Sequence, residues 1–407
     1  MTAWIDQPSH HLWLEAESQR LLAFGRHFAA PGGGSYWLDE DGSPDVGQPV
    51  FTWISARMAH VYALAHLRGT PGAGALALRA LAGLDGPLHD ARHGGWFHGV
   101  GPDGPTIDEK SAYTHAFVIL AASSCTVAKL PGARPLLDEA LDVYLERFWD
   151  EDDGLARDSW DRTWSTLDDY RGVNANMHAV EAMLAASDAT GDPAWRARAL
   201  RIVTRVVDGW ARRNGWRIPE HFDAAWNPLL DYNADRPADQ FKPFGATIGH
   251  GLEWARLVLH VHAAIGETAP TWMVPAAIEL YARAVTDGWA VDGAPGFVYT
   301  TDWTGNPVVR TRLHWVPAEA IGAAAALYLA TGESRYDADY RRWWDYVADH
   351  VMDLERGSWH HELDETNRPA ASVWPGKADI YHAYQATLVP RSPLAPGLAL
   401  AQRAGTV

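Results

Sequence analysis

Apolar residues recur at intervals of three and four along most of the chain, in segments rich in alanine, leucine and arginine. This spacing places the apolar side chains on one face of a helix. It predicts twelve helices in six pairs: 48–68 with 72–84, 108–130 with 134–149, 173–190 with 193–213, 246–265 with 270–288, 312–331 with 335–351, and 376–389 with the N-terminal segment 9–30. We therefore expect a predominantly helical protein.

A second pattern separates the helix pairs: a glycine, an aromatic-rich extended run and then a turn. It begins at Gly34, Gly95, Gly154, Gly215, Gly296 and Gly357, so the intervals are 61, 59, 61, 81 and 61 residues. Asp-Gly, Gly-Asn or Asn-Pro at the bends is typical of β-hairpins. Repeats bury their apolar faces against their neighbours, and six of them can close into a ring. We predict one domain over residues 1–407, an all-α (α/α)6 barrel of twelve helices. The hairpins would lie at one end and the helices that follow them would form the inner ring.

The fourth repeat carries an insertion of about 20 residues, LLDYNADRPADQFKPFGA, at 229–246. Pro237, Pro243 and Gly245 exclude a helix over this segment, which ends four residues before His250. Long loops of this kind are often functional. We expect a lid that closes over the site with Tyr232, Phe241 and Phe244, although a plain surface loop is also compatible with the sequence.

The net charge of the chain indicates which classes of binding partner are excluded. Lysine and arginine number 34 and aspartate and glutamate 51, which gives a net charge of −17. Such a surface repels phosphate backbones and anionic membranes, so we expect neither nucleic acid nor a membrane as a partner. The N-terminus does not resemble a signal peptide, and the single Cys125 is typical of a cytoplasmic protein and of a packing role. The oligomeric state stays open.

Polar residues fall at similar distances from the repeat glycines, which predicts that they converge on one end of the barrel. Five residues share this property: Arg57, 23 after Gly34; His178, 24 after Gly154; Glu319, 23 after Gly296; His382, 25 after Gly357; and His250, about 15 after Gly215 once the insertion is subtracted. Each also has a structural interpretation. The histidines could be hydrogen-bonded core residues, Arg57 could pair with Glu319, and Glu253 could brace its own helix.

Four motifs carry a resemblance to a known family: GHGLEWARL from Gly249, NANMHAVEAM from Asn174, FTWISAR ending at Arg57, and WPGKADIYHAYQ from Trp374. With them the chain resembles the N-acylglucosamine 2-epimerase superfamily over nearly its whole length. The form KADIYHAYQ, which includes Lys377, is most similar to the aldose-ketose isomerase branch, to which mannose and sulfoquinovose isomerases belong. One difference is Ile248, where the family pattern has proline before Gly249 and His250.

The resemblance implies a catalytic pair, His250 and His382, assisted by Glu253. It implies a sugar pocket lined by Arg57, Asn174, His178 and Glu319. We include four aromatic residues in the expected substrate-binding set, although packing in the core is the other interpretation of each tryptophan: Trp53, Tyr113, Trp315 and Trp374.

The implied reaction is the interconversion of D-mannose and D-fructose, with D-lyxose and D-xylulose as a second pair, through a cis-enediolate. Two histidines near their ordinary pKa of about 6.5 suit this proton transfer, so neither a metal nor another cofactor is expected. Four alternatives stay open. They are a sulfoquinovose isomerase, a sugar 2-epimerase of the same fold, a glycoside hydrolase and a sugar-binding protein without catalysis.

Overall fold

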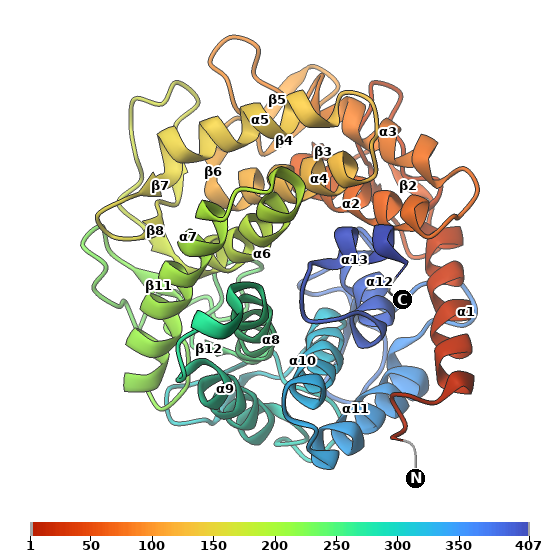
Figure 1. Ribbon diagram of the computed structural model, residues 1–407, viewed down its shortest axis with the longest axis vertical. Helices are drawn as coiled ribbons and strands as arrows, with labels where there is room; N and C mark the ends of the chain where they lie inside the picture. Colours follow the sequence, from red (N-terminus) through yellow and green to blue (C-terminus); the bar gives the residue numbers. More distant parts are fainter. Residues whose placement is uncertain (1–2, 406–407) are drawn as a thin grey trace.

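Each repeat contributes one inner and one outer helix to a closed double ring, which the computed structural model describes for residues 3–405 (Figure 1). The inner helices are α2 (Thr52–Leu67), α4 (Ala112–Val127), α6 (Val173–Thr190), α8 (Ile248–Ile265), α10 (Trp315–Thr331) and α12 (Tyr381–Leu388). The outer helices are α1 (Pro8–Gly25), α3 (Ala73–Leu84), α5 (Ala133–Val143), α7 (Ala194–Val203), α9 (Met273–Gly288) and α11 (Ser334–Tyr346). The predicted (α/α)6 barrel is confirmed, and so is the inner ring formed by the helices after the hairpins.

The helix count differs from the prediction, because the described part of the chain has thirteen α-helices. The additional α13 (Leu398–Ala404) packs against α2, α4 and α6. Leu398 and Leu400 surround an internal cavity together with Leu120, Leu184 and Leu257, which lie in the second halves of α4, α6 and α8. The short segment LALAQRA therefore closes the barrel at the C-terminal ends of the inner helices, a role that its local sequence does not reveal.

Three outer helices end in π-helical turns, at Tyr144–Phe148 (η1), Thr204–Ala211 (η2) and Val347–Val351 (η4). Short 3-10 turns follow α8 and α12, at Gly266–Thr268 (η3) and Val389–Arg391 (η5). The residues of the inner helices are buried almost all round, for example Val316–Leu327 in α10, because these helices face the outer ring on one side and the barrel interior on the other.

Short strands join neighbouring repeats at the opposite end. Five inner helices are preceded by two-residue strands: β3 (Val50–Phe51), β6 (Lys110–Ser111), β10 (Arg171–Gly172), β12 (Ala246–Thr247) and β15 (Arg312–Leu313). Each pairs antiparallel with a strand of the next hairpin: β4 (Gly99–Gly101), β9 (Ser159–Trp160), β11 (His221–Phe222), β13 (Thr300–Thr301) and β16 (Glu362–Leu363). Several inner helices therefore begin a few residues later than the apolar spacing predicts. The strand residues before them fit the same three- and four-residue spacing of apolar side chains, so the sequence pattern does not separate strand from helix.

The remaining strands complete the hairpins: β1 (Trp37–Leu38) with β2 (Pro44–Asp45), β7 (Trp149–Asp150) with β8 (Leu155–Ala156), β5 (Gly104–Ile107) with β4, and β14 (Pro307–Val309) with β13. All six repeat glycines have positive φ, from 62° at Gly215 to 113° at Gly296, which explains their recurrence. Four bends are closed by an aspartate whose Oδ1 accepts backbone N–H groups two and four residues later, at Asp161, Asp223, Asp302 and Asp364. The dipeptides named from the sequence were therefore only part of the turn chemistry.

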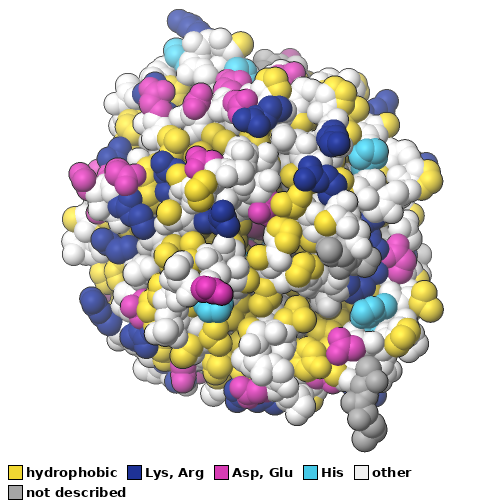
Figure 2. Space-filling view, in the orientation of Figure 1, with side chains coloured by type: hydrophobic (Ala, Val, Ile, Leu, Met, Phe, Trp, Pro, Cys, Tyr) yellow, Lys and Arg dark blue, Asp and Glu magenta, His cyan; other side chains and the backbone are white. Residues whose placement is uncertain are grey.

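The molecular surface mixes acidic, basic and apolar side chains, as Figure 2 shows for the face seen in Figure 1. From residue 3 to residue 405, every helix is too short or too polar to cross a membrane. Cys125 is fully buried in α4, which confirms its predicted packing role.

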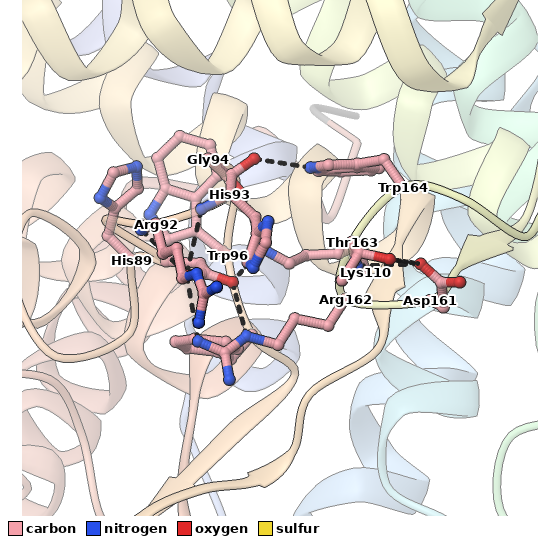
Figure 3. A network of polar contacts seen from close by, with 12 residues as sticks. His89, Arg92, His93, Gly94, Trp96, Lys110, Asp161, Arg162, Thr163 and Trp164 are labelled. Carbon is pink, nitrogen blue, oxygen red and sulfur yellow. Dashed lines mark hydrogen bonds and ion pairs between the residues drawn. The ribbon is translucent and has the colours of Figure 1, made fainter.

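A buried ion pair fixes the second hairpin to the ring. Asp90 accepts bonds from Lys110 Nζ at 3.2 Å and Arg162 Nε at 2.9 Å, and Lys110 also donates to the carbonyl oxygen of Gly94 (Figure 3). Trp164 covers the pair from the neighbouring hairpin and donates to the carbonyl oxygen of His93. Two other hairpins repeat the arrangement, with Arg312 on Asp292 at 2.7 Å and Lys377 on Asp353 at 2.6 Å. Three of the six hairpins are thus held to the ring by enclosed charges.

We predict that Lys110→Met destabilises the fold by about 3 kcal/mol, because it leaves the buried Asp90 carboxylate with one cation instead of two. The free energy of unfolding in urea measures the effect. Arg134→Ala is the control, since it removes an exposed pair with Asp138 and should cost less than about 1 kcal/mol. Equal losses in the two variants would show that the buried pair contributes nothing beyond a surface pair.

Candidate active site

A cavity of about 600 Å³ opens at the end of the barrel where the inner helices begin. Its wall is formed by side chains from the first six residues of all six inner helices, from the hairpins and from the inserted loop: Arg57, Tyr113, Asn174, His178, Gln240, Phe241, His250, Glu253, Tyr299, His314, Trp315, His361, Trp374, Ala378, Asp379 and His382. The positive ends of the inner-helix dipoles point toward this cavity, which favours negative charge on a bound molecule.

Each of the two predicted catalytic histidines is held by a carboxylate behind it. His250 Nδ1 lies 2.8 Å from Glu220 Oε1, and His382 Nδ1 lies 3.1 Å from Glu319 Oε1. Because an ionised carboxylate only accepts, Nδ1 must carry the proton in both rings. When such a ring is neutral, its Nε2 keeps the lone pair, and both histidines line the cavity. This is the state that a general base requires.

Trp315 packs against both histidines, with ring centroids 5.2 Å from His250 and 5.9 Å from His382. The closeness of α8 and α10 here depends on Gly249, since a Cβ atom at that position would overlap the Trp315 ring. The position of the His250 ring therefore depends on the small size of Gly249. The helix α8 begins at Ile248, where the family pattern has proline.

Arg57 is fixed by polar and aromatic contacts. Its Nη1 donates to Asp379 Oδ2 at 3.1 Å and its Nη2 donates to Tyr113 Oη at 3.1 Å. The guanidinium also lies 4.5 to 4.9 Å from the centres of three aromatic rings, those of Phe117, Trp53 and Tyr381. The alternative ion pair of Arg57 with Glu319 is wrong, because Asp379, three residues before His382, is the carboxylate that α12 brings to Arg57.

Glu319 pairs instead with Arg256, whose Nε and Nη2 both lie 2.8 Å from Oε2. Burial opposes the charged form of Glu319, but Arg256 and His382 hold its pKa below the ordinary value. Burial and the neighbouring Glu319 carboxylate raise the pKa of Glu253 well above its ordinary range. Two adjacent carboxyl groups thus differ in charge, with Glu319 ionised and Glu253 favouring its protonated form.

The other histidines of the wall are neutral. Burial lowers the pKa of His178 to about 4 and that of His314 to about 3. Burial also lowers the pKa of His382, although its hydrogen bond to Glu319 acts in the opposite direction. At neutral pH the wall therefore offers uncharged imidazoles as acceptors and bases, with Arg57 as its permanent cation.

Nine of the eleven predicted site residues line the cavity: Arg57, Tyr113, Asn174, His178, His250, Glu253, Trp315, Trp374 and His382. The two others lie behind the wall. Trp53 is 1% exposed and packs against Trp374, and Glu319 is 4% exposed and holds His382. The sequence offset gave the correct height in the barrel for Glu319, but an offset does not specify the direction of a side chain. Glu253 holds neither catalytic histidine, and it lies 3.6 Å from Arg256 one turn along its own helix.

Sequence reasoning missed several residues that complete the site: Glu220, Arg256, Asp379, His314 and His361. His314 and His361 stack at 3.8 Å between centroids, from two hairpin segments joined by β15 and β16. Asp379 lies within the quoted motif KADIYHAYQ and Arg256 within GHGLEWARL, so the motifs contained a signal for both. Glu220 has no such signal, because it lies before the insertion, 30 residues from His250.

The inserted loop covers part of the cavity. Gln240 and Phe241 belong to the wall, and the Phe241 ring lies 5.5 Å from Trp374 and 6.1 Å from Tyr113. Tyr299 Oη donates to the carbonyl oxygen of Gln240 at 3.4 Å, and Lys242 Nζ lies 3.8 Å from the centre of the Tyr170 ring. The segment therefore contributes to the cavity wall and does not lie wholly on the outer surface.

Two clusters in the described part of the chain bring three potential metal ligands together, His178 with Glu181 and Glu253, and Glu40 with Asp353 and His360. A buried cation already lies beside each cluster. Arg256 Nη2 is 3.6 Å from Glu253 in the first, and Lys377 Nζ is 2.6 Å from Asp353 in the second. Because these cations repel a metal ion and compensate the carboxylates, we expect neither cluster to need a metal.

Comparison with known proteins places this chain among sugar isomerases and epimerases. Residues 33–386 match the family model of N-acylglucosamine 2-epimerase. The D-mannose isomerase of Thermobifida fusca is 52% identical over 401 residues, which cover 98% of each chain. The D-mannose isomerase of Pseudomonas cannabina pv. alisalensis is 50% identical over 403 residues, with 98% of this chain and 97% of the other covered. A crystal structure of a D-mannose isomerase superposes with a TM-score of 0.88 at 28% identity, over 95% of this chain and 99% of the other.

Proposed function

Because the chain belongs to the N-acylglucosamine 2-epimerase family and is a sugar isomerase, we propose that it interconverts D-mannose and D-fructose. D-Lyxose and D-xylulose would be a second pair of substrates. The observation that carries the proposal is the pair His250 and His382, each with Nδ1 on a carboxylate and Nε2 free for proton transfer. The names of the relatives at about half identity support the same substrate class.

We assign the proton transfer between carbons to His382 and the opening of the sugar ring to His250. His382 Nε2 removes the proton from C2 as the C1 carbonyl becomes an enediolate oxygen, and returns that proton to C1. The hydroxyl proton of O2 passes to O1 in the same reaction, so that O1 becomes a hydroxyl and O2 becomes the carbonyl. The proton is thus transferred within the substrate and no net redox partner is needed. An imidazole suits both directions, because its pKa lies close to neutral pH.

Negative charge grows on O1 and O2 in the enediolate. Arg57 lies at the wall and is held rigidly by Asp379 and Tyr113, so its guanidinium can donate to these oxygens without reorganising. His178 is the second proposed donor. One such donor contributes about 3 kcal/mol to transition-state stabilisation in other enzymes. Glu253 is left to bind a sugar hydroxyl, since Glu220 and Glu319 already orient the catalytic histidines.

The charged residues of the cavity wall also help to distinguish isomerisation from the other candidate functions. A sulfonated sugar needs a free cation, and among the described wall residues Arg57 is the one arginine or lysine and is already paired with Asp379. A glycoside hydrolase needs two carboxyl groups at the bond that breaks. The acids of the wall are Glu253 and Asp379, and Asp379 is bound to Arg57. These observations favour isomerisation of a neutral monosaccharide. A 2-epimerase would use the same histidines and differ in where the proton returns.

NMR of the protein with D-mannose in heavy water tests the function, and we expect D-fructose as the main product, with any exchanged deuterium at C1. Lyxose, glucose and sulfoquinovose are assayed in parallel to rank substrates. The reaction is repeated in EDTA, because we propose proton transfer without a metal. Glucose with deuterium at C2 as the main product would make the protein an epimerase. Activity lost in EDTA and restored by zinc or manganese would end the metal-independent mechanism.

Replacing either histidine should remove the chemistry and keep the fold. We expect His382→Asn and His250→Asn each to lower turnover by at least about two orders of magnitude, a usual contribution of an acid/base group. Circular dichroism monitors the fold. His10→Asn is the matched control, because His10 is also buried but lies in the outer helix α1. A folded variant with near-normal isomerisation would exclude the replaced histidine from the mechanism.

The loop of residues 229–246 should act as a lid that opens for substrate. We expect proteases to cut within 231–243 in the free protein and saturating mannose or fructose to suppress the cuts, because the sugar would hold Phe241 against Trp374. Shortening the loop to the length of the other repeats should lower turnover and leave the helical spectrum unchanged. A shortened protein that works at the parental rate, or cleavage that sugar does not affect, would contradict the lid.

A further inference from the structure

Arg256 reaches the reacting histidine from behind the wall. It lies in α8, is 4% exposed and does not belong to the lining of the active-site cavity. Both Nε and Nη2 contact Glu319 Oε2 at 2.8 Å, while the other oxygen of that carboxylate, Oε1, lies 3.1 Å from His382 Nδ1. The Arg256 guanidinium of α8, the Glu319 carboxylate of α10 and the His382 imidazole of α12 thus form one buried hydrogen-bonded series. Oε2 of the carboxylate bonds to Arg256 and Oε1 bonds to His382.

Three carboxyl groups surround this guanidinium. Besides Glu319, Glu253 Oε1 lies 3.6 Å from Nη2, and Glu181 faces Arg256 from α6. The three carboxyl groups do not all stay ionised beside one cation: the pKa of Glu181 and that of Glu319 are lowered by Arg256 and their hydrogen bonds, whereas burial and the Glu319 carboxylate raise the pKa of Glu253. The two close contacts of Arg256 go to Glu319, and this agrees with the lowered pKa of Glu319 and the raised pKa of Glu253.

The protein keeps space for this contact. Gly322 lies in α10, one turn after Glu319, and a Cβ atom there would lie 2.9 Å from Arg256 Cδ. Alanine is otherwise the better residue inside a helix. The absence of a side chain at Gly322 therefore leaves room for the Arg256 side chain beside α10, where its Nε and Nη2 reach Glu319 Oε2.

We propose that Arg256 is a positioning residue for the isomerisation, which keeps Glu319 ionised and oriented so that His382 carries its proton on Nδ1 and presents the Nε2 lone pair to the sugar. The inference rests on the proposed function. A protonated Glu319 could donate to Nδ1, and the imidazole would then carry its proton on Nε2, where it cannot act as the base. Arg256 thus selects the tautomer of a residue that it does not touch.

Other charged and titratable groups also face His382 and bear on any pH profile. Besides Glu319 from α10, they are Arg57 from α2, Asp379 and Tyr381 from its own segment, His178 from α6, and the hairpin residues His314 and His361. Arg57 and Asp379 form their own ion pair at 3.1 Å. A change at Arg256 leaves this pair intact, so a shift in the profile reports on the carboxyl groups around Arg256, and the tautomer of His382 distinguishes Glu319 from the others.

The test compares the pH dependence of kcat/KM for D-mannose in Arg256→Gln, Arg256→Lys and Gly322→Ala. Without the guanidinium, Glu319 should bind a proton more readily, and we expect the acid limb of the profile to move to higher pH by about one to three units. Turnover at pH 7 should fall by about tenfold or more, and KM should change little, since Arg256 does not line the cavity. Arg256→Lys should restore most of the acid limb. Gly322→Ala should give a smaller shift in the same direction with the fold retained.

Arg391→Gln is the matched control. Its side chain is 7% exposed, against 5% for Arg256, and it pairs with Glu15 at the other end of the barrel. We expect this variant to lose stability and to keep the parental pH profile. If Arg256→Gln does not fold, Gly322→Ala decides, because it displaces the arginine and removes no charge.

A second measurement does not depend on activity. In histidine labelled with 15N, the His382 signals, identified by their loss in His382→Asn, report which nitrogen carries the proton in the resting protein. We expect Nδ1 in the parent and a shift toward Nε2 in Arg256→Gln at pH 7. If the parent did not isomerise mannose but the tautomer still shifted, the proposed function would fail and the positioning role would stand. An unchanged tautomer together with an unchanged pH profile in folded Arg256 and Gly322 variants overturns the inference.

Discussion

Ring closure is the constraint on which the other features of this protein depend. Each repeat can bury the apolar faces of its two helices only against its neighbours, so six repeats are stable together once the first and last are joined. The joint is made by α1, which packs with α12, and by Lys377, which contacts Asp353 and backbone oxygens of Glu40 and Gly357. Closure also brings the first turns of the inner helices to one end, and the cavity is formed there.

The closed ring makes a dense cluster of buried charge possible. Two cations, Arg57 and Arg256, lie among Asp379, Glu319, Glu253 and Glu181, and all come from inner helices or the segment just before one. Arg57 lines the cavity and Arg256 lies behind its wall. Such a cluster is costly to enclose unless each charge has a partner, and the geometry meets that condition by giving each cation its own close carboxylate. Glu319 also orients His382, which we propose as a catalytic base, so stability and the proposed chemistry share that contact.

The inserted loop adds what the regular repeats lack. Short hairpins leave the cavity open, and Gln240 and Phe241 extend over it from the one repeat that is about 20 residues longer. Phe241 packs against the rings of Trp53, His98, Tyr113 and Trp374, and His221 Nε2 lies 2.8 Å from the carbonyl oxygen of Pro243. Opening of the proposed lid therefore requires Phe241 to leave these rings, while the helices beneath it stay fixed.

The sequence by itself determined the repeat, the barrel and the height of the site. Apolar periodicity and the recurring glycines are local properties, and each glycine marks a positive φ that the next turn requires. The same offsets identified His178, His250 and His382. Only the tertiary structure decided which charges meet. Arg57 lies 322 residues from Asp379, Arg256 lies 63 from Glu319, and Glu220 reaches His250 across the insertion. These pairings depend on the curvature of the closed ring and on the direction of each side chain, which spacing along the chain does not contain. For that reason Arg57 was matched with the wrong carboxylate, and Trp53 and Glu319 were expected on a wall that they support from behind.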